Sequence, residues 1–126
     1  MAGRRGERRA TVDDGFLAYL LDALTPPGGV TARRMFGAFG LYRDGAFFGI
    51  VSAGRLYLKT APADRAAFIA AGMGPFRPSE RQTLHRYYEA PADVVEDPTL
   101  LRDWVERAVL AARAGDNPDR QNETDG

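Results

Sequence analysis

The sequence predicts an α+β fold whose elements follow the order α-β(3)-α-β(2)-α. Three observations support this prediction. Apolar residues alternate with polar ones between Thr31 and Lys59, a second strand-like stretch lies within residues 75–89, and three further segments have apolar residues at helical spacing. A chain of 126 residues is long enough to form one domain with its own core.

The first predicted helix belongs to the domain that we expect over residues 11–115. Residues 1–10 contain four arginines and no apolar periodicity, which predicts a flexible basic arm. Thr11 and Asp14 then have the spacing of a capping box, and an apolar stripe follows at Phe16, Leu17, Leu20, Leu21 and Leu24. Because Pro26 and Pro27 cannot continue a helix, the helix should end before them and cover one face of the sheet.

The stretch from Thr31 to Lys59 predicts a meander of three strands. Turns are expected at Asp44-Gly45 and Ala53-Gly54, where glycine permits positive φ. The middle strand, residues 46–51, is apolar on both faces and should lie inside the sheet. In the last strand, Leu56 and Leu58 should face the core while Arg55, Tyr57 and Lys59 face outward. We interpret Gly37 and Gly40 as sites of a kink or bulge within the first strand, or of close approach by the first helix.

The second half of the domain is predicted to begin and end with helices. Thr60 is a candidate N-cap for a helix that starts at Pro62 and ends at Gly72. Asp97-Pro98 is a strong start signal for the last helix, which should run to Gly115 with the best apolar stripe of the chain.

Two strands are expected between these helices. A weak edge strand is expected at residues 75–78, and a stronger one at residues 83–89. Simple alternation places Leu84, Arg86 and Tyr88 on one face of the stronger strand and His85 and Tyr87 on the other. Residues 116–126 contain no apolar side chain and are expected to form a disordered polar tail.

The composition offers no set of residues that would predict catalysis. The chain has no cysteine and a single histidine, His85, for which the sequence shows no partner. Neither a GxSxG motif nor a phosphate-binding GxxxxGK[ST] loop occurs, and the acidic residues are scattered. We therefore expect a non-enzymatic protein with no catalytic residues, no cofactor and no metal. Because the chain has neither a secretory leader nor a membrane-length apolar segment, we expect a cytoplasmic location and no membrane contact.

Positive charge is concentrated in the strands. Although 17 basic and 17 acidic residues cancel over the whole chain, residues 31–90 contain nine basic and four acidic side chains, which gives a net charge of +5. Arg43 and Tyr42 belong to this basic and aromatic group. The candidate interaction surface consists of Arg33, Arg34, Arg55, Tyr57 and Lys59. Three interpretations remain open, namely an ordinary solvated sheet face, a nucleic-acid-binding surface and a protein-binding surface.

Residues 32–42, ARRMFGAFGLY, resemble the opening signature of the TfoX/Sxy N-terminal domain family. Further matches follow in order at Asp44-Gly45 with Phe47-Phe48, at residues 54–59, at Phe76, at residues 87–91 and at Asp97-Pro98 leading to Trp104, so that the resemblance covers about residues 13–112. It implies a two-layer α/β sandwich with a mostly antiparallel sheet, similar to type III secretion chaperones. The best-known members regulate natural competence together with the cyclic-AMP receptor protein, and they carry a second, helical domain. The matches here concern the N-terminal domain alone.

The expected function is a non-enzymatic protein-interaction module, a transcription- or competence-related regulator or adaptor. Its partner would be a protein, for example a transcription regulator, and the chain itself would be a monomer or a homodimer. The alternative is a nucleic-acid-binding protein that uses the basic sheet surface and the N-terminal arm.

Overall fold

The computed structural model describes residues 2–35 and 37–115, with side chains from residue 13 onward. Its elements are, in chain order, α1 (Ala2–Ala23), β1 (Val30–Met35), β2 (Ala38–Arg43), β3 (Ala46–Ser52), β4 (Arg55–Lys59), α2 (Pro62–Ala70), β5 (Pro75–Ser79), β6 (Gln82–Glu89), α3 (Ala92–Glu96) and α4 (Pro98–Gly115). The polar tail expected at residues 116–126 lies outside the described residues.

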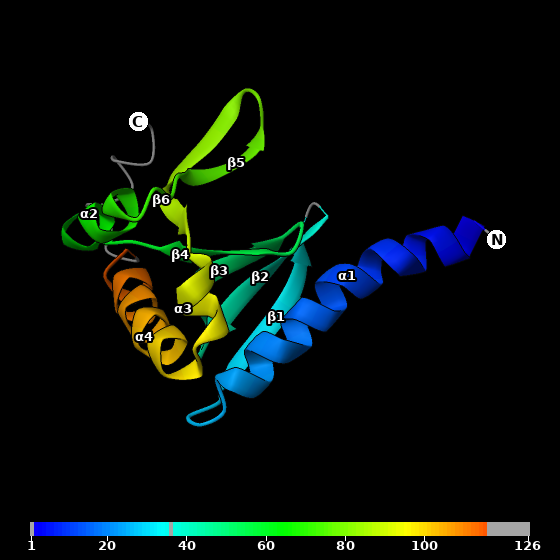
Figure 1. Ribbon diagram of the computed structural model, residues 1–126, viewed down its shortest axis with the longest axis horizontal. Helices are drawn as coiled ribbons and strands as arrows, with labels where there is room; N and C mark the ends of the chain where they lie inside the picture. The colour runs from blue at the N-terminus through cyan, green and yellow to red at the C-terminus, as the bar shows by residue number, and fades with distance from the viewer. Residues whose placement is uncertain (1, 36, 116–126) are drawn as a thin grey trace.

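The fold is α+β, as predicted. Six strands form one open antiparallel sheet in the order β1-β2-β3-β4-β6-β5. The strand β3, which is apolar on both faces, lies inside this sheet between β2 and β4, as expected. The helices α1 and α4 contact each other and pack on the sheet at β3 and β4, with α3 against α4. In Figure 1 the β5–β6 hairpin extends beyond the other strands, as does the N-terminal end of α1.

The main core lies between these helices and one face of the sheet. Its fully buried side chains include Leu20 of α1, Leu41 of β2, Phe48 and Val51 of β3, Leu56 and Leu58 of β4, and Leu101 and Val105 of α4. Leu56 and Leu58 face this core while Tyr57 points away from it, which confirms the alternation expected for β4. None of the helices within the described ranges is long and apolar enough to cross a membrane.

Two elements were missed by the sequence-based prediction. The first expected strand is in fact the hairpin β1–β2, because Gly37 adopts φ +80° and Met35 pairs with Ala38 across the turn. Gly37 therefore ends a strand instead of kinking one. The second is the short helix α3, which follows Pro91 without a side-chain cap and so lacked a start signal.

Three details of the prediction were wrong. The first helix begins at Ala2 instead of Thr11, since the arginines, glutamate and alanines of residues 2–10 are good helix formers and outnumber the two glycines, Gly3 and Gly6. Mobility of that segment as an arm, and a domain boundary at residue 11, remain predictions. Thr60 does not cap α2, whose N-cap is Ala61. Its buried hydroxyl instead donates to the carbonyl of Arg86, 2.9 Å away.

The third correction concerns β6. Its pairing with β5 shifts between Pro75↔Tyr88 and Phe76↔Leu84, so extra residues of β6 bulge out. As a result Leu84 shares an apolar cluster with Tyr87, while Tyr88 packs on the main core. Simple alternation, which put Leu84 with Tyr88, could not foresee this bulge.

Candidate functional site

The side of the sheet opposite α1 and α4, which we call the open face, carries a second apolar cluster. Ala38, Ile50 and Tyr87 are buried there beneath partly buried Phe47, Tyr57, Phe76 and Leu84. All seven residues belong to strands, so among the described residues this cluster is formed by the sheet and the β5–β6 hairpin without a helix over it. Ile50 is fully buried although no described helix covers it.

Aromatic rings on the open face contact one another across the strands. The centroids of Tyr42 and Phe47 are 5.1 Å apart in a stacked arrangement, and those of Phe47 and Tyr87 are 5.3 Å apart. Beneath them Gly40 has no side chain, and a Cβ there would come within 2.8 Å of the Met35 sulfur and 3.1 Å of the Phe47 ring. The glycine thus makes room for the aromatic layer.

A groove of about 540 Å³ opens where the β5–β6 hairpin faces the ends of β1, β2 and β3. Its walls are Met35, Ala38, Ile50 and Ser52 on the sheet side and Phe76, Arg77, Pro78, Ser79, Gln82 and Leu84 on the hairpin side. The size and the mostly apolar lining fit a site that receives an apolar side chain or small ligand. Sequence reasoning did not find this groove, since its walls meet only through the bulged hairpin.

Four of the five predicted surface residues occupy open-face positions in their strands. Arg33 lies over the ring of Tyr42 at 5.6 Å. Lys59 lies over that of Tyr87 at 5.9 Å, but its ammonium end lies beside Gly115 at the C-terminal end of α4. Arg55 and Tyr57 share this face, as expected from β4. Arg34 does not, because it neighbours Arg33 in a strand and points to the opposite face, where it lies over Phe39 at 5.0 Å.

Arg55, Glu89 and Tyr57 form a charged group on neighbouring strands. A nitrogen of Arg55 lies 3.3 Å from a carboxylate oxygen of Glu89. Burial, and secondarily the negative charge of Glu89, raise the pKa of Tyr57, although Arg55 opposes the shift. The phenol of Tyr57 therefore keeps its proton to a higher pH than an ordinary tyrosine does.

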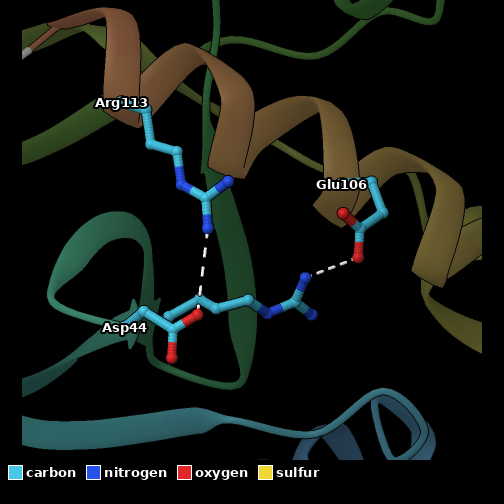
Figure 2. Close-up of polar contacts among 4 residues, drawn as sticks. Asp44, Glu106 and Arg113 are labelled. Carbon is cyan, nitrogen blue, oxygen red and sulfur yellow. Dashed lines mark hydrogen bonds and ion pairs between the residues drawn. The ribbon is translucent and has the colours of Figure 1, made fainter.

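Arg43, grouped with the surface cations by sequence, is buried on the helix side. Its Nη1 donates to Glu106 of α4 at 2.5 Å, and Arg113 of α4 lies 3.8 Å from Asp44 in the β2–β3 turn (Figure 2). Alternation offered a signal for this, since Arg43 shares the parity of the buried residues Phe39 and Leu41. These contacts join α4 to the helix-covered face of the sheet. Arg43 is therefore not part of the open face.

His85 is exposed on β6, and no group of three or more metal-ligating side chains gathers in the described ranges. The fold and the open face together define a class of protein, a small α+β domain with one helix-covered and one uncovered sheet face.

The chain belongs to the TfoX N-terminal domain family, whose model matches residues 22–112. The match spans β1 to most of α4 and excludes most of α1. Membership suggests a regulatory role related to competence, and the family is not known for enzymatic activity. A comparison with curated protein sequences finds no match.

Proposed function

We propose that the protein is a cytoplasmic, non-enzymatic regulatory module, related to competence or transcription control, that binds a protein partner on its open face. The observation that carries this proposal is the uncovered sheet face, with its aromatic layer and its groove of about 540 Å³. A sheet face needs an apolar covering on one side only, so an aromatic layer on the second side favours an interaction surface.

The residue types on the open face suit a protein partner. Tyrosine, phenylalanine, methionine and arginine are enriched in interfaces, and aromatic side chains that fill a pocket contribute most of the binding energy. Here Met35 and Phe76 line the groove, and the cations Arg33 and Arg55 lie on the same face. A partner that inserts an apolar side chain into the groove and carries acidic residues around it would match both features.

The second candidate function is binding of single-stranded nucleic acid, favoured by Arg33 over Tyr42 on the sheet surface. Base stacking needs free ring faces. The rings of Tyr42 and Phe47 instead stack on each other, with an angle of 25° between their planes. The ring arrangement thus favours a protein partner over nucleic acid.

Site-directed photocrosslinking in the native host tests the proposal. A photoreactive amino acid replaces Gln82, an exposed residue that lines the groove, and in a matched control replaces Leu110, an exposed apolar residue of α4. We expect one protein to crosslink at position 82 and not at position 110. With that protein purified, Leu84→Glu should weaken binding at least about tenfold, while Leu110→Glu should leave it unchanged.

Equal crosslinking at both positions, or equal effects of the two glutamate variants, would contradict the proposal.

A salt titration with single-stranded DNA tests the second candidate function, nucleic-acid binding. Binding with a steep salt slope that is lost in the Arg33→Ala and Arg34→Ala double variant would support nucleic-acid binding instead.

A further inference from the structure

The strand β1 forms an outer edge of the sheet. It pairs with β2 over all six of its residues without a register shift, and β2 is its only strand neighbour among the described residues. Within those residues, no backbone hydrogen bond from a turn, loop or cap reaches residues 30–35. Alternate N–H and C=O groups of β1 therefore point outward, and an extended chain could pair with them.

The opposite edge of the sheet lacks this property. The edge strand β5 contains Pro75 and Pro78, which have no N–H to donate, and its pairing with β6 shifts twice. Such features protect an edge from further pairing. Since β1 has no proline and no bulge, it is the edge available for strand addition.

Two adjacent arginines, Arg33 and Arg34, give the β1 edge a positive charge. Arg33 lies over Tyr42 on the open face, and Arg34 lies over Phe39 on the helix-covered face. Both arginines are exposed, and in residues 13–35 and 37–115 no carboxylate forms an ion pair with either of them. Contact with a ring restricts each guanidinium and leaves its N–H groups available to a carboxylate.

We propose that β1 binds an extended segment of a partner protein that carries two adjacent acidic residues, which adds to the sheet as a further strand. Consecutive residues of a strand point to opposite faces, so two adjacent carboxylates would meet Arg33 and Arg34, one on each face. This inference rests on the proposed role as a protein-interaction module, but it concerns a surface other than the groove.

Other occupants of the β1 edge fit less well. In a second copy paired through β1, the arginines of both chains would lie close together, and like charges opposite each other are destabilising. A nucleic acid would match the charge, but it has no row of amide groups to pair with the strand backbone.

The test uses a synthetic peptide of about ten residues, valine and threonine in alternation around a central Asp-Glu pair, added to the full chain. Amide chemical shifts should change in β1 and not in β5. Arg33→Ala with Arg34→Ala should weaken binding about tenfold, as should replacing Asp-Glu by Asn-Gln in the peptide. The charge-matched control, Arg81→Ala with Arg107→Ala, should change binding by less than about twofold, because neither arginine belongs to β1 or lines the groove.

A peptide with every backbone nitrogen methylated has no N–H to donate from either edge, so it cannot form a strand ladder and should not bind. Equal binding of this peptide, an equal loss in the control variant, or a β1-mediated dimer in sedimentation would each overturn the inference. These results are independent of crosslinking at position 82, so the β1 proposal and the open-face function can fail separately.

Discussion

At the residue scale, Arg43 is the clearest case of a charge that the fold buries. Its side chain is 8% exposed, its Nη1 contacts Glu106, and its Nε and Nη2 have no hydrogen-bond partner among the described residues. We expect Glu106→Gln to lower the free energy of unfolding by about 1–3 kcal/mol, because the buried guanidinium loses its counter-charge.

Arg43→Met should cost less than Glu106→Gln, and the double variant should be no less stable than Arg43→Met alone. Urea unfolding of the four proteins measures this double-mutant cycle. Additive losses would mean that Arg43 and Glu106 do not interact.

Tyr57, on the open face, should make the stability of the protein depend on pH in the alkaline range. Burial, followed by the charge of Glu89, raises its pKa above the ordinary value of 10.0, so the folded state holds the phenolic proton more tightly than the unfolded state. This contribution to stability is present below pH 10 and should be lost as the pH rises through the folded-state pKa. Tyr57→Phe should therefore lose less stability than the wild type between pH 9 and pH 11 in urea unfolding. Parallel curves would show that Tyr57 does not titrate differently in the folded state.

At the element scale, prediction from sequence worked where the local pattern alone decides the structure. The alternation in β4 correctly placed Leu56 and Leu58 in the core, and Asp97-Pro98 marked the start of α4, where the Asp97 carboxylate accepts from the Thr99 amide at 3.0 Å. Prediction failed at Gly37, where the apolar pattern continues through a turn, and in β6, where a bulge sets the faces. The turn at Gly37 and the bulge in β6 both depend on how a strand pairs with its neighbour, which the local pattern does not show.

Two glycines should respond in opposite ways to alanine. Gly15 lies inside α1 with nothing within 4 Å of the position that a Cβ would occupy, so Gly15→Ala should stabilise the protein by about 0.5–1 kcal/mol through helix propensity. Gly40→Ala should destabilise it by about 1 kcal/mol or more, because the new methyl group displaces Met35 and Phe47. Thermal unfolding followed by circular dichroism measures both. A neutral Gly40→Ala would show that the aromatic layer adjusts without cost.

At the scale of the whole molecule, the candidate site arises from long-range arrangement. The sequence identified Arg55, Tyr57 and Lys59 as outward-facing and grouped Arg33 and Arg34 with them. In the structure all of these but Arg34 occupy open-face positions in their strands. The groove was not predictable, since it exists only because the β5–β6 hairpin faces β1, β2 and β3. Arg34 could have been separated from Arg33 by strand alternation alone, which puts neighbours on opposite faces.

The two apolar layers should unfold together, because adjacent residues of β3 serve both. Ile50 is fully buried in the open-face cluster and Val51 in the main core. Ile50→Ala should lower the free energy of unfolding by about 2–5 kcal/mol and shift a single transition. Fluorescence of Trp104, which packs against the main core, and fluorine NMR of a 3-fluorotyrosine label at Tyr87 should give the same urea midpoint. A Tyr87 midpoint below that of Trp104 would instead show an open face that unfolds on its own, so that a partner would bind a layer less stable than the main core.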